Sequence, residues 1–351
     1  MGEGWDEGKS MSKKSNTPLG IFTESIGLYF SNFDKFIKYM SFPVLGQIAG
    51  LGLVFLLTYF YAKNMPNIVE KVAILNDIKI LFLILFLLVL PGLAIFMKAF
   101  WEYLVAYGAV NSMVENMLKS GKVYDFDAHT ELVKRRTMTF VGLWFLFGIF
   151  SLISIIPFFW VPFGVLAVFF VLIFQTFTFE PEQTPFGCVK RSLELVKGHF
   201  LSTFLLLALV GALTYVFVPQ LANLFFEYTN LTKIFSNMVL PIINELPLKE
   251  WSNLLSYMYL PPLESEKIAS FTITTFVAQI FIQYTLPLRS IMWSMWYKEL
   301  NGGKLYVNNE DKPKKASKKK PSEKLMQASN KKYSSKKLDR NILKRAMEKD
   351  D

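Results

Sequence analysis

The sequence predicts an all-α, polytopic membrane protein with six transmembrane helices. Five stretches of the 351-residue chain contain no Asp, Glu, Lys or Arg: 39–62, 80–97, 137–179, 200–226 and 268–288. A helix needs about 20 apolar residues to cross a bilayer core, and these runs lack the short alternating pattern of barrel strands. The composition agrees, since 19% of the residues are charged, against about 25% in a soluble domain.

The six spans are expected at 42–62, 79–100, 138–157, 162–179, 200–219 and 268–290. Four of them each follow from one uncharged stretch. The stretch 137–179 is too long for one crossing, and Pro157 and Pro162 bracket its middle. Because proline interrupts helices and favours turns, we expect a tight turn at the membrane surface there, and therefore two spans.

Two short motifs occur twice in the chain, in the same order. Thr-Pro-x-Gly, followed by Ser and then Phe at fixed spacing, starts at Thr17 and again at Thr184. Leu-x-x-Gly-Lys-x-Tyr occurs at 118–124 and at 300–306. These matches predict a parallel internal repeat, in which helices one and two correspond to helices five and six around a central hairpin of helices three and four. Such a repeat either only builds a stable bundle or forms a substrate site at its interface, as in many transporters.

An amphipathic helix is predicted just before the fifth span. Thr184 is its N-cap and Pro185 its first residue, and apolar residues recur every three or four positions through 186–200. We expect the helix to lie along the cytoplasmic leaflet with its basic residues toward the lipid phosphates. The expected headgroup contacts are Lys190, Arg191 and Lys197. Residues 19–30 show the same apolar pattern before the first span.

The distribution of Lys and Arg predicts the orientation. The N-terminal segment and the connection between the second and third helices hold five basic residues each, whereas the loop 220–267 has three basic against five acidic residues. Since cytoplasmic loops are enriched in Lys and Arg, both termini are expected in the cytoplasm. Six crossings require that both termini lie on the same side of the membrane, which agrees with this orientation.

The segments outside the spans are expected to meet lipid or protein partners. Residues 1–16 and the tail 307–351 are predicted to be disordered. From residue 298 onward the chain has 17 Lys and Arg against 8 Asp and Glu, which attracts anionic lipids. Nucleic acid is not an expected partner, because the aromatic residues of a stacking platform are missing. The apolar loop 220–267 predicts short amphipathic helices on the outer surface, where an envelope protein could dock.

Three motifs carry a family resemblance: the Thr-Pro start, the run 191–200 and Trp-Tyr-Lys-Glu-Leu at 296–300. Over residues 15–306 the chain resembles the membrane domain attached to some bacterial glycerophosphoryl diester phosphodiesterases and its stand-alone relatives. Glu299 stands where that family has Asp. The catalytic barrel is absent, because no soluble segment approaches the ~200 residues it needs. The resemblance therefore implies a membrane module of the bacterial cytoplasmic (inner) membrane, without phosphodiesterase activity.

No catalytic, metal or cofactor site is predicted. The segment 125–131 contains three carboxylates and His129, which on a strand would suggest a metal site. We favour the alternative, in which Asp125 or Asp127 caps a helix that leads into the third span. The single cysteine, Cys188, is expected to be buried and inert.

A polar stripe follows one face of the sixth predicted span. Its members are Thr272, Thr275, Gln279 and Gln283. Gln47 and Gln175 are placed to face it from other spans. Such residues either line a pathway or hydrogen-bond neighbouring helices. The sequence therefore favours a non-catalytic membrane module or scaffold, and the alternative is a transporter or lipid-handling protein with a site between the two repeats.

Overall fold

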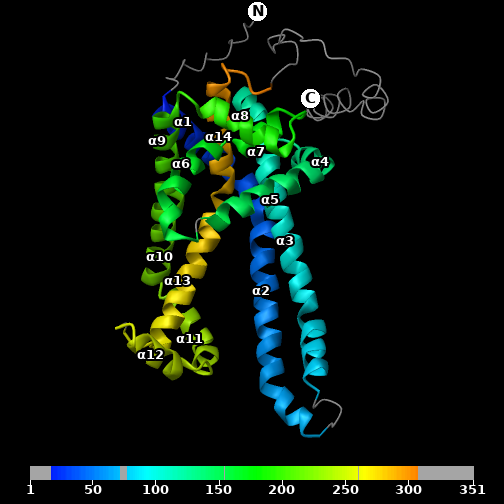
Figure 1. The fold of residues 1–351 in the computed structure, drawn as a ribbon, viewed down its shortest axis with the longest axis vertical. Coiled ribbons are helices and arrows are strands. Elements are labelled where there is room, and N and C mark those ends of the chain that lie inside the picture. The colour runs from blue at the N-terminus through cyan, green and yellow to red at the C-terminus, as the bar shows by residue number, and fades with distance from the viewer. Residues whose placement is uncertain (1–16, 72–76, 154, 260, 307–351) are drawn as a thin grey trace, which may run out of the picture.

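The computed structural model describes residues 17–71, 77–153, 155–259 and 261–306. The disorder predicted for 1–16 and 307–351 lies outside these residues. The described chain is helical and contains no strand. Its first described residues and its last ones lie at the same end of the molecule (Figure 1), here named the terminal end; the opposite end is the far end.

The longest elements are α2 (Phe33–Val69) and α3 (Ile78–Ser120), which form an antiparallel hairpin. The side chain of Asp77 caps α3 by accepting a hydrogen bond from the Lys79 backbone N–H at 2.9 Å, and α3 ends at Gly121, whose φ of 72° is a left-handed conformation that suits glycine. The two helices cross tightly at Gly50 and Gly92, where a Cβ atom has no room.

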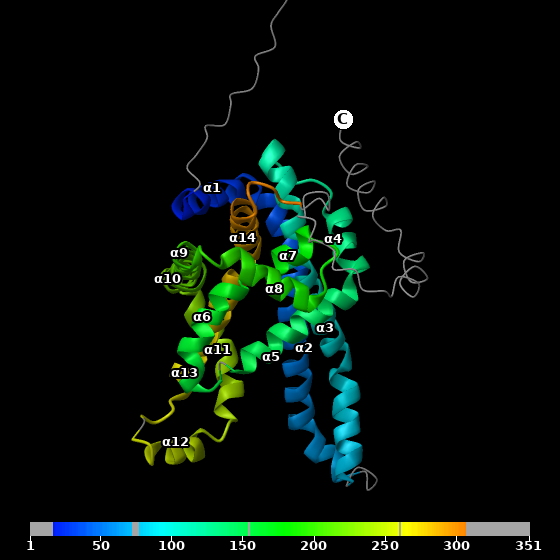
Figure 2. The same ribbon diagram turned by 45° about the horizontal axis from the view of Figure 1, so that its top comes forward.

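A second arm stands beside the hairpin. It contains the continuous rod α9 (Phe200–Gly211), η3 (Ala212–Phe217) and α10 (Val218–Tyr228). The other long element of this arm is α13 (Ser265–Tyr284), followed by α14 (Leu286–Leu300) at an angle of 42°. Figures 1 and 2 show the two arms diverging from the terminal end toward the far end.

Four helical segments are long and apolar enough to span a membrane: α2, α3, Trp160–Phe179 and Phe200–Tyr228. The bent pair α13–α14 makes a fifth if it is counted as one span. The chain is therefore a polytopic helical membrane protein. The predicted count of six is not reproduced among the described residues, because α5 (Thr137–Ile153) is apolar but short.

The central hairpin is shallower than predicted. After α5 and the short helix η2 (Pro157–Phe159), the chain returns through α6 (Trp160–Phe170) and α7 (Ile173–Phe179). The turn begins at Pro157, as expected, but Figure 1 shows it about midway along the long axis, far short of the far end. Hydropathy reports how apolar a segment is, not how steeply it crosses the bilayer.

The main core lies at the terminal end, around the last turns of α3 and α14. Four shorter helices surround it: α1 (Pro18–Ser31), α4 (Phe126–Arg135), α7 and α8 (Pro185–Val196). Phe140, Phe177 and Tyr297 are among its fully buried side chains. At the far end, α11 (Leu231–Asn244) and α12 (Leu248–Ser256) fill the predicted outer loop and pack on α13 through Ile243 and Ala269.

Candidate functional site

The two predicted amphipathic helices begin as expected. The Oγ1 atoms of Thr17 and Thr184 accept hydrogen bonds from the backbone N–H groups of Gly20 and Gly187, at 3.2 and 3.1 Å. The apolar face that the sequence indicates is only partly the buried one, because Phe186 is 73% exposed.

The faces that are buried instead correspond between the two helices. In α1 this face contains Ile21, Ser25 and Tyr29, and in α8 it contains Cys188, Ser192 and Val196, the residues at the same motif positions. Ser25 donates to the sulfur of Met295 in α14. Ser192 donates to the carbonyl oxygen of Phe169, beside the break between α6 and α7. Both helices thus pack into the core by one face.

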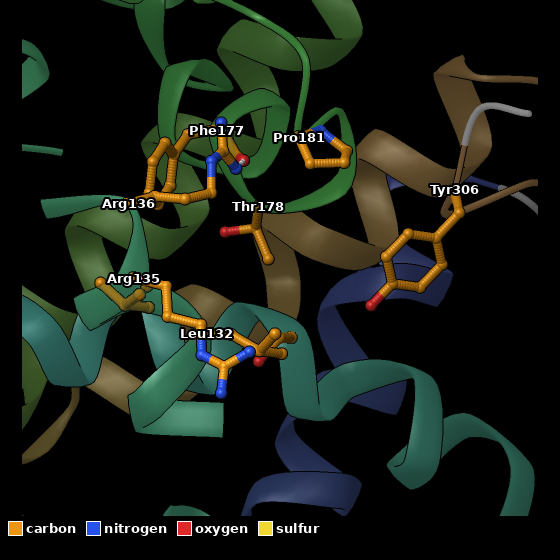
Figure 3. Close-up of a pocket in the computed structure, with 10 residues that line it drawn as sticks. Leu132, Arg135, Arg136, Phe177, Thr178, Pro181 and Tyr306 are labelled. Carbon is orange, nitrogen blue, oxygen red and sulfur yellow. Dashed lines mark hydrogen bonds between the residues drawn. The ribbon is translucent and has the colours of Figure 1, made fainter. Parts of the chain in front are cut away.

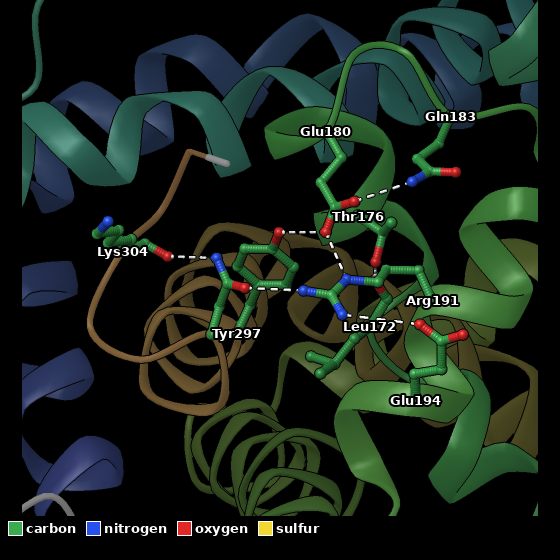
Figure 4. A network of polar contacts seen from close by, with 9 residues as sticks. Leu172, Thr176, Glu180, Gln183, Arg191, Glu194, Tyr297 and Lys304 are labelled. Atoms are coloured by element: carbon green, nitrogen blue, oxygen red, sulfur yellow. Dashed lines mark hydrogen bonds and ion pairs between the residues drawn. The ribbon is translucent and has the colours of Figure 1, made fainter. Parts of the chain in front are cut away.

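Arg191, predicted to contact lipid, is held in a network with other protein groups (Figure 4). Its Nε lies 2.8 Å from Oε1 of Glu180, and its Nη2 donates to Oδ1 of Asn301 at 2.9 Å. The Tyr297 hydroxyl donates to the same Glu180 oxygen at 2.9 Å, and the Gln183 amide donates to the other at 3.0 Å. Since Glu180 is nearly buried, this network joins α7, α8 and α14.

Lys190 and Lys197 of α8 are both exposed. Neither makes an ion pair within the part of the chain that the structure describes. Their predicted contact with lipid headgroups therefore stays a prediction, and their position at the terminal end is compatible with it.

The segment that resembled a metal site is a helix start. Asp125, at φ 43°, accepts a hydrogen bond from the Ala128 backbone N–H at 3.0 Å and caps α4, which confirms the favoured interpretation. His129 is buried, and its Nδ1 lies 2.7 Å from the Ser112 hydroxyl. Burial lowers the pKa of His129 to about 4. Among the described residues no group of three metal-ligating side chains gathers.

A small cavity of about 80 Å³, with Ser112 among its lining residues, is shown in Figure 3. Arg136 packs its guanidinium over the Phe177 ring, 4.2 Å from the centroid, and donates to the carbonyl oxygen of the same residue. Tyr306, from the second copy of the Leu-x-x-Gly-Lys-x-Tyr motif, lines the opposite wall. This volume holds a few waters, which is too small for a substrate.

Cys188 is fully buried, as predicted, and burial raises the pKa of its thiol to about 12. The thiol is therefore protonated at neutral pH. It fills space in the face of α8 that packs on the core.

The polar stripe of α13 faces away from the core. Thr272, Thr275 and Gln279 are exposed, on the side opposite the residues that pack on α10 and α11. Gln283 is half-buried, and its Oε1 lies 3.4 Å from Nε2 of Gln47 in α2, as predicted.

The prediction for Gln175 is wrong. Its amide donates to Oδ1 of Asn111 at 3.2 Å, inside the core. Helix α7 turns it toward α3 rather than α13. The stripe is therefore neither sealed in a tight core nor faced by Gln175.

Two polar contacts bridge the arms on either side of this stripe. One is the contact between Gln47 and Gln283. The other lies nearer the far end, where the Tyr59 hydroxyl of α2 is 3.4 Å from Oε1 of Glu245 at the end of α11. Thr272, Thr275 and Gln279 precede Gln283 at spacings of three and four residues, so they share the face of α13 that Gln283 turns toward Gln47 of α2.

A basic groove, which sequence reasoning missed, lies between α2, α3 and α4 at the terminal end. Its volume is about 630 Å³, and its lining includes Lys35, Lys38 and Lys134. Glu102 and Asp127 also line it, so positive charge is in excess. The available signal was the spacing of Lys35 and Lys38, which places both on one face of the first turns of α2.

Apolar and hydroxyl groups complete the basic groove. Buried Pro43 and Val105 line its inner part, together with Phe42. The Tyr39 hydroxyl lies 2.8 Å from Oγ1 of Thr130, which ties α2 to α4 across the groove. Lysine ammonium groups beside an apolar lining suit an amphiphile with an anionic headgroup.

The fold and these sites define a helical membrane protein with a polar, partly basic terminal end. No family model matches the chain, and comparisons with curated proteins and with solved structures give no match either.

Proposed function

We propose that this protein is a non-catalytic membrane module that binds anionic phospholipid at its terminal end. The observation that carries the proposal is the basic groove between α2, α3 and α4. When the phosphate of a phospholipid lies among these lysines, the acyl chains of the lipid lie beside Phe42 and the apolar surface of α2. Along α2 they then point toward the bilayer core.

The lysines of the groove are arranged for this role. Lys35 is fixed, because its Nζ donates to the Val123 carbonyl oxygen at 3.0 Å and lies 5.3 Å from the centre of the Tyr124 ring. Lys38 and Lys134 are exposed and form no ion pair within the described residues. Each lysine near an anionic membrane surface contributes about 1 kcal/mol. Glu102 and Asp127 can accept hydrogen bonds from headgroup hydroxyls, which favours a hydroxylated headgroup such as glycerol.

The proposed topology is six membrane passes with both termini in the cytoplasm of a bacterial inner membrane. The central hairpin of α5 and α6 then supplies the third and fourth passes as a shallow pair. The excess of Lys and Arg at the terminal end supports this orientation. The matching buried faces of α1 and α8 support an internal repeat, and the resemblance to the membrane domain of the phosphodiesterases agrees with a module of this kind.

The test compares lipids retained by the full chain in nanodiscs that contain phosphatidylglycerol and phosphatidylcholine, using native mass spectrometry. The double variant Lys38→Gln/Lys134→Gln should retain about thirtyfold less phosphatidylglycerol, since two lysines contribute about 2 kcal/mol. The matched control is Lys71→Gln/Lys79→Gln, which removes the same charge from exposed residues at the far end. Equal losses in the two variants would refute a site in the groove.

A second candidate, a lipid-handling or transport role, is favoured by the polar stripe that faces the space between the arms. In this role Gln279 and Gln283 contact a headgroup or a small molecule that enters sideways from the bilayer. Gln279→Leu/Gln283→Leu should then lose a lipid or small molecule that co-purifies with the parent protein. Retention of the same molecules, or a stoichiometric envelope protein in their place, would leave the membrane module as the better proposal.

A further inference from the structure

A second polar pocket lies where α10, α11 and α13 meet at the far end, and it is separate from the basic groove. Its volume is about 390 Å³. Its lining includes Glu227 at the end of α10, Thr232, Lys233 and Ser236 of α11, and Glu266 of α13. This pocket is here named the far pocket.

Polar atoms in and beside the far pocket lack partners. Thr232 is 8% exposed, and its Oγ1 forms no hydrogen bond within the described residues. The same holds for Oγ of Ser236, one turn further along α11, and for Oδ1 of Asn223 in α10. Since a buried polar group without a partner is unfavourable, these atoms indicate that a ligand or water completes the site.

The charges of the far pocket have both signs. Glu227 and Glu266 bring two carboxylates and Lys233 brings one ammonium group, and none of the three is in an ion pair among the described residues. Carboxylates can bind a primary ammonium group and Lys233 can bind an anionic group of the same ligand. The hydroxyls of Thr232 and Ser236 can donate to that anionic group as well. The combination suits a zwitterion better than a simple anion or cation.

The apolar residues of the lining are Leu240 of α11 and Ala269 of α13. Phe225, Ile234 and Met238 are exposed on the same helices, but helical spacing turns them away from the lining residues. A lipid headgroup and a soluble zwitterion would therefore both be recognised by the polar lining.

We propose that the far pocket binds a zwitterion with a primary ammonium group a few bonds from an anionic group, as in the ethanolamine phosphate headgroup. Two sources share this chemistry: phosphatidylethanolamine of the adjacent leaflet and a free solute such as O-phosphoethanolamine. The site is independent of the basic groove, so either proposal can fail without the other.

The test uses the full chain in phosphatidylcholine nanodiscs, with phosphatidylethanolamine in the bilayer or O-phosphoethanolamine in the buffer, and measures bound ligand by native mass spectrometry. Choline lacks N–H donors, so phosphatidylcholine is the background. Retention from the bilayer alone identifies the lipid, and retention of the solute identifies a free zwitterion. If neither ligand is retained above the background, the proposal is wrong.

The variants separate binding from folding. Glu227→Gln/Glu266→Gln should reduce retention at least fivefold, while the control Glu245→Gln/Glu250→Gln, at the same end but outside the lining, should not. Thr232→Val removes an unpartnered hydroxyl, so it should raise the unfolding temperature of the ligand-free protein and still weaken binding. A Thr232→Val protein that is less stable without ligand, or that binds as tightly as the parent, would contradict the assignment.

Discussion

Asn32 and His199 have the same backbone conformation, with φ −124° and ψ 21° at Asn32 and φ −123° and ψ 22° at His199. Each stands at the break between an amphipathic helix and a long apolar helix. The side chain of Asn32 also joins two parts of the first half, because Nδ2 donates to the Gly121 carbonyl oxygen and Oδ1 accepts from the Val123 N–H, both at 3.0 Å. His199 is exposed, so the two breaks share a backbone conformation but not this side-chain link.

Asn32→Ala should destabilise the protein by about 2 kcal/mol, because it leaves the buried Val123 N–H without its partner. His199→Ala removes an exposed side chain at the equivalent break and should change the free energy of unfolding by less than about 0.5 kcal/mol. Thermal unfolding of both variants in one detergent checks the difference. Equal effects would show that the break matters and the side-chain link does not.

The buried carboxylate of Glu180 should contribute more to stability than its neighbour Glu194. Glu180→Gln weakens the contact with Arg191 in a nearly buried site, and we expect a loss of about 2 kcal/mol. This is below the 3–5 kcal/mol of a fully buried pair, because the Arg191 side chain keeps 28% exposure. Tyr297→Phe should cost about 1 kcal/mol by removing one hydrogen bond.

Glu194→Gln is the control for this network. Glu194 also lies near Arg191, at 3.7 Å, but its side chain is 54% exposed. An exposed ion pair contributes about 1 kcal/mol or less in most cases, so Glu194→Gln should leave the free energy of unfolding almost unchanged. Chemical or thermal unfolding measures all three variants, and a Glu194 effect as large as that of Glu180 would contradict the role given to burial.

Local features of the structure could be predicted from the sequence, whereas most distant pairings could not; the contact between Gln47 and Gln283 is the exception. The caps at Thr17, Thr184 and Asp125 depend on residues three positions away, so the pattern contains the needed information. The partner of Glu180 depends on how the chain turns between α7 and α8, which hydropathy does not record. Gln175 was misplaced for the same reason, since the short helix α7 decides which neighbour its side chain meets.

Acidification should destabilise the protein through His129. The pKa of His129 is about 4 in the folded protein, against 6.5 for an ordinary histidine. The unfolded chain therefore binds a proton that the folded chain excludes as the pH falls from about 6.5 to about 4. Stability is therefore fully present above pH 6.5 and declines across this window, by up to about 3 kcal/mol. His129→Gln should flatten this part of the pH profile.

Unfolding temperatures of the parent and of His129→Gln between pH 4 and 7.5 provide the measurement. Carboxylates titrate at the lower end of this range in both proteins, so the difference between the two profiles isolates the imidazole. Parallel profiles would mean that the folded protein tolerates a protonated His129, for example because the contact with Ser112 stabilises the charged ring.

The close crossing of α2 and α3 at Gly50 allows a direct comparison of two glycines. A Cβ on Gly50 would lie 2.5 Å from the Phe96 backbone nitrogen and 2.8 Å from the Gly92 carbonyl oxygen, whereas a Cβ on Gly52 would meet nothing within 4 Å. Backbone atoms cannot move aside as a flexible side chain does. Gly50→Ala should therefore force the helices apart and cost about 1–3 kcal/mol, while Gly52→Ala should be neutral or stabilising by up to about 1 kcal/mol.

Other contacts of the hairpin, such as the hydrogen bond from the Tyr61 hydroxyl of α2 to the Leu81 carbonyl oxygen of α3 at 2.7 Å, are the same in both variants. The two alanine variants have the same composition and lie two residues apart on α2, so a difference in their unfolding temperatures reports the crossing and not helix propensity. If Gly50→Ala were as stable as Gly52→Ala, the close crossing would contribute little, and the other contacts between the two helices would hold the hairpin.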